Sequence, residues 1–187
     1  MTARQPGGAQ ERPRDAFGAA CRYLTARERC AGEVRAYLRR SGFSADEIEP
    51  AIERLVSERL VDDMRYARLY VEMRSRRSPR SGALLARELT ARGIGAETAR
   101  AAVSEFLAEV PEEELARRLL DKLPGSGEAW KRRAARRLVS RGFRASLALR
   151  LAGRGAAVGS QGGAGATGAA DAYIDEDGLD GIETEED

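Results

Sequence analysis

The sequence predicts an all-α fold, a tandem array of three three-helix repeats that form an elongated, curved body. The first observation is a phrase that occurs three times, in which Leu is followed by three mostly polar residues, Gly and a bulky apolar residue. Its copies end at Phe43, Ile94 and Phe143, and their glycines are spaced 51 and 49 residues apart. The second observation is that no window alternates with period two for long enough to indicate a strand.

Each copy of this phrase has the composition of a helix C-terminus. The Leu faces inward on the last turn, and the Gly takes the left-handed position after the helix, where a Cβ would be unfavourable. The apolar residue that follows then folds back onto the last turn. A period of about 50 residues indicates units of one design that stack on one another.

The first repeat is expected over residues 15–59, after an N-terminal arm, residues 1–14, whose polar composition predicts disorder. Apolar residues at helical spacing predict its three helices, which lie around residues 17–24, 34–38 and 48–55. The third helix begins with a capping box, in which the side chains of Ser44 and Glu47 bond to free backbone amides.

The second and third repeats are expected over residues 60–109 and 110–152, on the same plan. The first helix of the second repeat is predicted to start at Asp62-Asp63, because acids are favourable at a helix N-terminus. It is predicted to break at Ser78-Pro79. The last helix of the third repeat is expected to be short and to end at Gly153, as in many terminal repeats.

Charge divides the chain into a basic body and an acidic tail. Residues 1–154 carry all 32 Lys and Arg together with 21 Asp and Glu, whereas residues 155–187 carry nine acids and no base. The segment 153–187 begins Gly-rich, so we expect a flexible linker followed by an acidic, disordered tail. A basic body fits an anionic partner, either nucleic acid or an acidic protein surface. The alternative is a solvated surface with no partner.

Two basic clusters are the candidate binding residues. One lies where the first two helices of the second repeat join, and it comprises Arg74, Arg76, Arg77 and Arg80. The other covers one arc of a helix in the third repeat, and it comprises Lys131, Arg132, Arg133, Arg136 and Arg137. That helix carries its apolar residues on the opposite side, so the cations should face outward. Contacts with phosphates or with an acidic protein are one interpretation of both clusters, and solubilising faces are the other.

The sequence predicts no enzymatic activity. It contains no His, which removes the commonest general base and metal ligand. Its two cysteines, Cys21 and Cys30, form no CxxC motif and have no His to activate them. We therefore expect no catalytic residue, no cofactor and no metal site.

The same composition predicts a cytoplasmic location. Two small thiols outside any disulfide framework fit a reducing compartment. No apolar run reaches the ~18–20 residues that a membrane-spanning helix needs. The N-terminal residues lack the apolar core of a signal peptide. We therefore expect no contact with a membrane.

Two runs of residues resemble the RecX family of recombination regulators. The segment from Tyr23 to Phe43 is similar to the first repeat of that family through Tyr23-Leu24, Ala26-Arg27-Glu28-Arg29-Cys30, Glu33-Val34, Leu38 and Gly42-Phe43. The second repeat is matched by Leu60-Val61-Asp62-Asp63, Tyr66-Ala67, Tyr70-Val71, Glu88-Leu89 and Gly93-Ile94. The similarity covers about residues 16–107 and, more loosely, residues 112–152. Cys30 stands where the family usually has Ser.

The resemblance implies a cytoplasmic bacterial protein of tandem three-helix repeats, and we expect this chain to be a monomer. It also implies binding to the RecA filament on single-stranded DNA. The expected effect is modulation, mainly inhibition, of the recombinase, ATPase and coprotease activities of that filament in homologous recombination, DNA repair and the SOS response. The residues leave two alternatives: a free-standing helical nucleic-acid-binding regulator that acts without RecA, and a plain helical scaffold.

Overall fold

The computed structural model describes residues 15–158, with side chains as far as Gly153. The predicted arm, residues 1–14, and the rest of the predicted linker and acidic tail, residues 159–187, lie outside the described residues. Within the described range every regular element is a helix. These helices are α1 (Ala16–Leu24), α2 (Ala31–Arg40), α3 (Ala45–Ser57), α4 (Asp63–Arg77), α5 (Gly82–Ala91), α6 (Ala96–Glu109), α7 (Glu112–Leu120), α8 (Gly127–Ser140) and α9 (Ala145–Val158).

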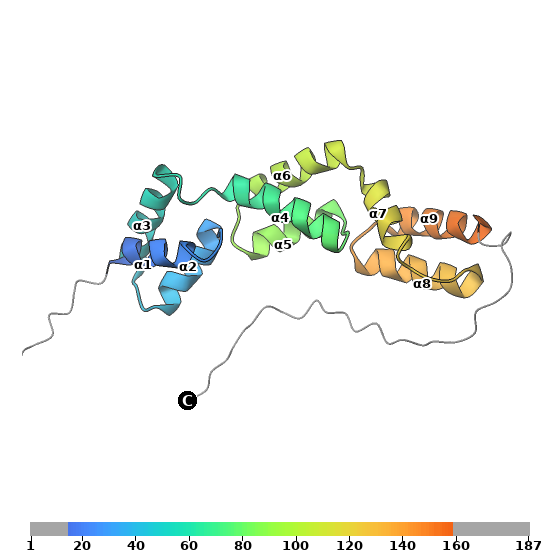
Figure 1. The fold of residues 1–187 in the computed structure, drawn as a ribbon, viewed down its shortest axis with the longest axis horizontal. Coiled ribbons are helices and arrows are strands. Elements are labelled where there is room, and N and C mark those ends of the chain that lie inside the picture. The colour runs from blue at the N-terminus through green and yellow to red at the C-terminus, as the bar shows by residue number, and fades with distance from the viewer. Residues whose placement is uncertain (1–14, 159–187) are drawn as a thin grey trace, which may run out of the picture.

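The helices follow one another in three sets along the long axis of the molecule (Figure 1). Helices α1–α3, α4–α6 and α7–α9 each surround a hydrophobic core. Leu38, Leu89 and Leu138, which begin the three recurring phrases, are fully buried in these cores. In Figure 1 the middle set lies above the line that joins the outer two, so the body is gently bowed. The prediction of an all-α fold is therefore confirmed.

The recurring phrase ends the second helix of every set in the same way. Gly42, Gly93 and Gly142 have φ angles of 83°, 89° and 84°, in the left-handed region that glycine adopts without strain. The amide of the apolar residue after each glycine donates to the carbonyl of the Leu five residues earlier, at 3.1, 3.2 and 3.1 Å. This Schellman geometry confirms the predicted helix ends.

The other local signals also correspond to helix boundaries. Glu47 Oε2 accepts a hydrogen bond from the Ser44 amide at 2.8 Å, which is half of the predicted capping box of α3. Asp62 Oδ1 accepts one from the Arg65 amide at 2.9 Å and caps α4, which ends before Ser78. These boundaries follow from contacts within four residues along the chain, which is why the sequence predicts them.

The prediction for the last helix is wrong. Helix α9 does not stop at Gly153 but continues to Val158, so the first six residues of the predicted linker are helical. A glycine inside a helix costs only about 1 kcal/mol relative to alanine. The neighbouring alanines are strong helix formers, and Leu147, Leu151 and Ala152 are buried against α8. Packing therefore carries the helix through a residue that would otherwise weaken it.

Helix α8 is one turn longer than its counterparts. Helices α2 and α5 begin 11 residues before their terminal glycine, whereas α8 begins 15 residues before Gly142. The additional turn brings in Trp130, whose indole Nε1 donates to the Leu123 carbonyl at 3.0 Å. Arg133 Nη2 likewise donates to the Pro124 carbonyl at 3.2 Å. The start of α8 is thus bonded to the loop that joins α7 to α8.

Candidate functional site

The second helices α2, α5 and α8 meet end to end and form a row along the molecule (Figure 1). At the first junction, Gly32 in α2 lies so close to the end of α5 that a Cβ on it would come within 2.4 Å of the Arg92 carbonyl oxygen. Cys30 Sγ donates to that same oxygen at 3.2 Å. At the second junction, the Ser81 amide donates to the Arg141 carbonyl at 3.0 Å. Helix α2 therefore starts against the glycine corner that ends α5, and α5 starts against the corner that ends α8.

A carboxylate from the following set completes each junction. Asp63, the first residue of α4, accepts a hydrogen bond from the Ala31 amide at 2.8 Å. Glu112, the first residue of α7, accepts one from the Gly82 amide at 2.9 Å. Both amides belong to the first turn of a second helix and have no partner within that helix. The sequence signal for this role is that α4 and α7 both begin with an acid.

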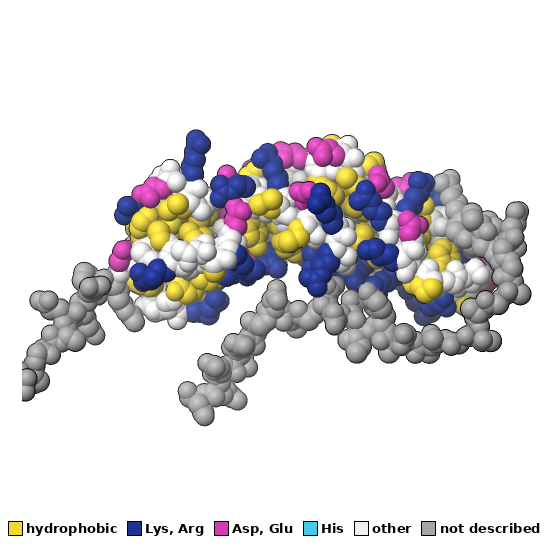
Figure 2. Space-filling view, viewed as in Figure 1, with side chains coloured by type: hydrophobic (Ala, Val, Ile, Leu, Met, Phe, Trp, Pro, Cys, Tyr) yellow, Lys and Arg dark blue, Asp and Glu magenta, His cyan; other side chains and the backbone are white. Residues whose placement is uncertain are grey.

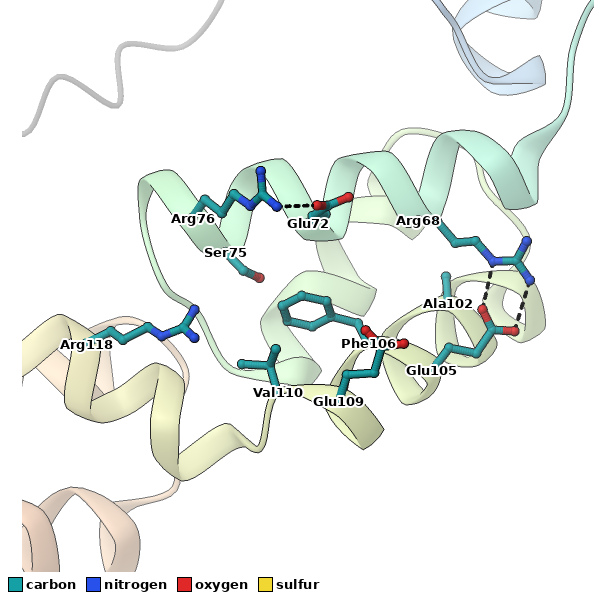
Figure 3. A pocket seen from close by; sticks show the side chains of 10 residues that line it. All are labelled: Arg68, Glu72, Ser75, Arg76, Ala102, Glu105, Phe106, Glu109, Val110 and Arg118. Atoms are coloured by element: carbon teal, nitrogen blue, oxygen red, sulfur yellow. Dashed lines mark hydrogen bonds and ion pairs between the residues drawn. The ribbon is translucent and has the colours of Figure 1, made fainter.

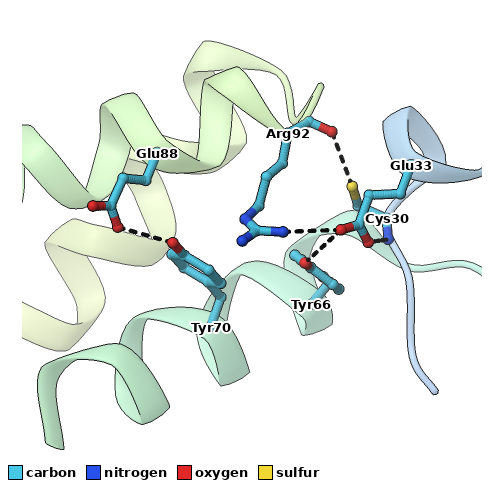
Figure 4. Close-up of polar contacts among 6 residues, drawn as sticks. All are labelled: Cys30, Glu33, Tyr66, Tyr70, Glu88 and Arg92. Atoms are coloured by element: carbon cyan, nitrogen blue, oxygen red, sulfur yellow. Dashed lines mark hydrogen bonds and ion pairs between the residues drawn. The ribbon is translucent and has the colours of Figure 1, made fainter. Parts of the chain in front are cut away.

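A polar network that no sequence motif indicates lies at the first junction (Figure 4). Arg92 Nη1 donates to Glu33 Oε1 at 3.0 Å, and the hydroxyl of Tyr66 donates to the same oxygen at 3.3 Å. Further along α4, the hydroxyl of Tyr70 donates to Glu88 at 2.8 Å. These side chains come from α2, α4 and α5, with up to 59 residues between partners, so no local pattern reveals them.

Burial shifts two pKa values in this network. Burial, together with the nearby negative charge of Glu33, raises the pKa of the Cys30 thiol to about 11. The same two causes raise the pKa of the Tyr66 hydroxyl to about 12. Both groups are therefore protonated at neutral pH. The Cys30 thiol is neutral and fully buried, so the junction holds it as a structural group and not as a nucleophile.

The first predicted cluster contains two arginines that pair with Glu88 and two that are exposed. Arg80 Nη1 donates to Glu88, and only 10% of the Arg80 side chain is exposed. Arg74 approaches the same carboxylate, with 3.7 Å between its Nε and Oε2. Glu88 in α5 therefore draws Arg74 and Arg80 toward the body. Arg76 and Arg77 are exposed, and Arg76 pairs with Glu72 at 2.6 Å.

The second predicted cluster keeps its arrangement. Trp130, Ala134 and Leu138 are buried, and the opposite side of α8 carries Lys131, Arg132, Arg133, Arg136 and Arg137, which we call the cationic face of α8. Lys131 lies 3.5 Å from Glu128, and Arg133 bonds to a backbone carbonyl. Within residues 15–153, Arg132, Arg136 and Arg137 form no ion pair with an acid. This face therefore presents charge that the body does not neutralise.

Charge is distributed unequally over the molecule. Helix α8 carries five cations and one acid, and α2 carries three arginines and one acid. In contrast, α3 carries four acids and one arginine, and α6 carries three acids and one arginine. In the view of Figure 2, Lys and Arg gather along the lower edge, where α2, α5 and α8 lie, and acids gather along the upper edge over α6. The row of second helices is the basic edge of the body.

A hollow of about 550 Å³ lies between α4, α6 and α7 (Figure 3). Arg68 pairs with Glu105 at 2.7 Å and Arg76 with Glu72, so its charged rim is largely satisfied. Phe106 and Val110 form an apolar wall, beside the buried hydroxyl of Ser75. Glu109 and Arg118 complete the lining, so the hollow is partly polar and partly apolar.

Two kinds of site are not found in the described part of the chain. Residues 15–153 contain no group of three or more acids and cysteines placed to hold a metal ion. None of the described helices combines the length and the apolar character needed to cross a membrane.

Comparison with known proteins places this fold in a family. The family models described as the first and second three-helix domains of RecX match residues 16–55 and 62–103. A regulatory protein RecX from Prosthecochloris aestuarii is 33% identical over 130 residues, which cover 70% of this chain and 86% of that protein. A regulatory protein RecX from Trichlorobacter lovleyi is 32% identical over 145 residues, covering 74% of this chain and 94% of that protein. The chain belongs to the RecX family.

The RecX fold is also found among solved structures. The crystal structure of RecX from Lactobacillus salivarius superposes with a TM-score of 0.65 at 22% identity, over 76% of this chain and 95% of that one. A second crystal structure, of a regulatory protein RecX, gives a TM-score of 0.61 at 24% identity. The family models end at residue 103, so the cationic face of α8 lies beyond the RecX domains that they match.

Proposed function

We propose that this RecX-family chain is a non-enzymatic, monomeric regulator that binds the RecA filament on single-stranded DNA in the bacterial cytoplasm. Binding would restrain the recombinase, ATPase and coprotease activities of the filament. The family membership supports a regulatory role. The observation that carries the proposed contact is the cationic face of α8, whose Arg132, Arg136 and Arg137 have no acidic partner within residues 15–153.

The repeat organisation belongs to the same proposal. We take residues 15–59, 60–109 and 110–152 as three repeats of one array, with α7–α9 as the third. The row of second helices supports this assignment, because α2–α5 and α5–α8 are joined by the same kind of junction. A long body with one basic edge can follow a helical polymer over several subunits, and its arginines can pair with carboxylates or phosphates of that polymer.

Of the predicted contact residues, we retain the exposed Arg76 and Arg77 and the whole cationic face of α8. Arg74 and Arg80 are assigned to internal pairing with Glu88 instead. An arginine held by an internal carboxylate has to break that pair before it can bind a partner, which reduces its net contribution.

The test is the salt dependence of binding. Replacing Arg132, Arg133 and Arg136 together with Ala should lower the slope of log affinity against log salt by about 2 on single-stranded DNA, at about 0.7 per lost phosphate contact. The same variant should bind RecA-coated DNA more weakly and inhibit it less. A matched control removes three cations elsewhere, at Arg68, Arg100 and Arg117, and should leave the slope unchanged. An unchanged slope and affinity in the first variant, with helicity intact, would remove α8 from the interface.

The alternative function is a free-standing nucleic-acid-binding regulator that acts without RecA. The same unpaired arginines on α8 favour it, because they need only phosphates. Titration on bare and on RecA-coated single-stranded DNA separates the two functions. A RecA regulator should prefer the coated strand and act in proportion to the number of filament sites, without turnover of its own. Equal affinity for both strands would favour the alternative, and a scaffold would bind neither.

A further inference from the structure

The cationic face of α8 has a candidate ligand within the same chain. Residues 171–187 contain nine acids, no base and a few apolar residues, beginning with Asp171-Ala172-Tyr173-Ile174-Asp175. The cationic face of α8 carries the complementary charges, on Lys131, Arg132, Arg133, Arg136 and Arg137. Val139, which follows this face on α8, is half exposed and provides an apolar contact point beside the arginines.

The direction of α9 brings the chain back to the N-terminal end of α8, where the cationic face begins. The two helices are joined by only four residues and pack through one core, so they run antiparallel. Both rise 1.5 Å per residue, so Val158 at the end of α9 lies about level with Gly127 at the start of α8. The chain therefore leaves the described body beside the first turns of α8, where Lys131, Arg132 and Arg133 are found.

The length of the intervening chain favours α8 over the other basic residues. Residues 159–170 are rich in Gly and Ala, and twelve such residues span roughly 20 Å. The cationic face extends only about 9 Å along the helix axis, from Lys131 to Arg137. Arg39 and Arg40 lie beyond the lengths of α8 and α5, more than about 35 Å along the row. A short tether gives the nearest site an effective concentration in the millimolar range, which falls steeply for distant sites.

We propose that the acidic segment 171–187 binds the cationic face of α8 and competes there with external anions. In this state the segment shields Arg132, Arg133 and Arg136 from other ligands. A partner that binds the row of second helices has to displace the segment first, so the segment sets a threshold for binding. The competition part rests on the proposed function; the intramolecular contact does not.

The experiment uses zero-length carbodiimide cross-linking of the full chain, which joins a lysine amine to a carboxylate in direct contact. The chain has only two lysines, Lys122 and Lys131, so the products can be assigned by mass spectrometry of peptides. We expect Lys131 to couple to acids of 171–187. Its coupling to Glu128, 3.5 Å away on the same helix, provides an internal reference in every sample. Lys122, exposed in the loop before α8, reports coupling that arises from the tether alone.

Three comparisons decide the outcome. Replacing Arg132 and Arg136 with Ala should lower the Lys131–tail product roughly tenfold relative to the Lys131–Glu128 product, because two of the attracting charges are lost. Replacing Arg39 and Arg40 with Ala should leave the ratio of these two products unchanged. Salt of about 1 M should suppress the tail product, because the Debye length falls to about 3 Å. Tail coupling to Lys122 and Lys131 alike, insensitive to Arg132 and Arg136, would overturn the proposal.

A fourth measurement separates this inference from the proposed function. Adding a single-stranded oligonucleotide should reduce the Lys131–tail product if both ligands share α8. A strong tail product that the oligonucleotide leaves unchanged would keep the intramolecular contact and remove the competition. Loss of DNA binding in the α8 variant, without any tail product in the parent chain, would keep the proposed function and remove the contact.

Discussion

Cys30 is a residue whose role depends on its surroundings. It precedes α2, at a position where the RecX family usually has Ser. Its backbone amide donates a hydrogen bond to Glu33 Oε2 at 3.4 Å. Its thiol reaches across the junction to the Arg92 carbonyl, and none of the side chain is exposed. A small, weakly polar group suits this place, because it fills apolar space and still satisfies one carbonyl.

The raised pKa values at this junction predict a loss of stability in alkali. The pKa of Cys30 rises from 9.0 to about 11, and that of Tyr66 from 10.0 to about 12, so the folded state holds both protons more tightly than the unfolded state. Their contribution is complete below pH 9 and is lost as the pH rises through 11 and 12. For Cys30 this is about 2–3 kcal/mol at most. Burial also raises the pKa of the Tyr70 hydroxyl, so Tyr70 adds to the loss of stability in alkali.

Urea unfolding at about pH 8 and about pH 10.5 checks this prediction. The free energy of unfolding should fall between the two pH values in the parent chain and fall less in Cys30→Ser, which has no thiol at this position. Tyr66→Phe should reduce the remaining fall. Equal losses in all three proteins would contradict the assignment.

At the scale of elements, the starts of α2 and α5 are specified by the set that follows each of them. Gly32 is an unfavourable residue for the first turn of α2 by helix propensity. It is needed there because the backbone of Arg92 and Gly93 lies where its Cβ would be, with 2.6 Å to the Gly93 Cα. The backbone on the other side of this contact belongs to the end of α5 and cannot move as a flexible side chain would.

Two glycine-to-alanine variants test this contact against helix propensity. Gly32→Ala should destabilise the chain by about 1–3 kcal/mol, because the steric overlap outweighs the gain in propensity. Gly153→Ala is the matched control, since Gly153 also lies within a helix and has no heavy atom within 4 Å of its Cβ position. It should stabilise the chain by about 0.5–1 kcal/mol. Thermal melts of both variants measure the sign of each change in stability. A stabilising Gly32→Ala would show that the junction can open freely.

At the scale of the whole molecule, the body is a one-dimensional array. Each set has its own hydrophobic core, and neighbouring sets contact one another at the junctions of the second helices. In such an array stability is roughly a sum of unit terms and neighbour terms, so a change at one junction acts mainly on the units beside it.

Glu112→Gln tests this view, because Glu112 caps α5 from the start of α7. Loss of this charged acceptor should cost about 1 kcal/mol. Native-state hydrogen exchange should show lower protection in α5 and in α7–α9, and unchanged protection in α1–α3. Glu114→Gln is the control, because Glu114 is exposed and pairs only with Arg118 on its own helix. A uniform loss of protection over all nine described helices would mean that the array unfolds as one unit.

The sequence by itself determined where most helices begin and end, and which face of α8 is cationic. These boundaries depend on contacts between residues a few positions apart, so they can be predicted from the sequence. They are the Leu-to-Gly phrases, the capping box at Ser44 and the break at Ser78-Pro79. The tertiary structure decided which charges remain available. Arg74 and Arg80 lie beside Arg76 in sequence, but the position of Glu88 on the neighbouring helix turns them inward. Packing on α8 likewise carried α9 past Gly153. Such outcomes depend on partners that only the folded chain brings together, which no local pattern encodes.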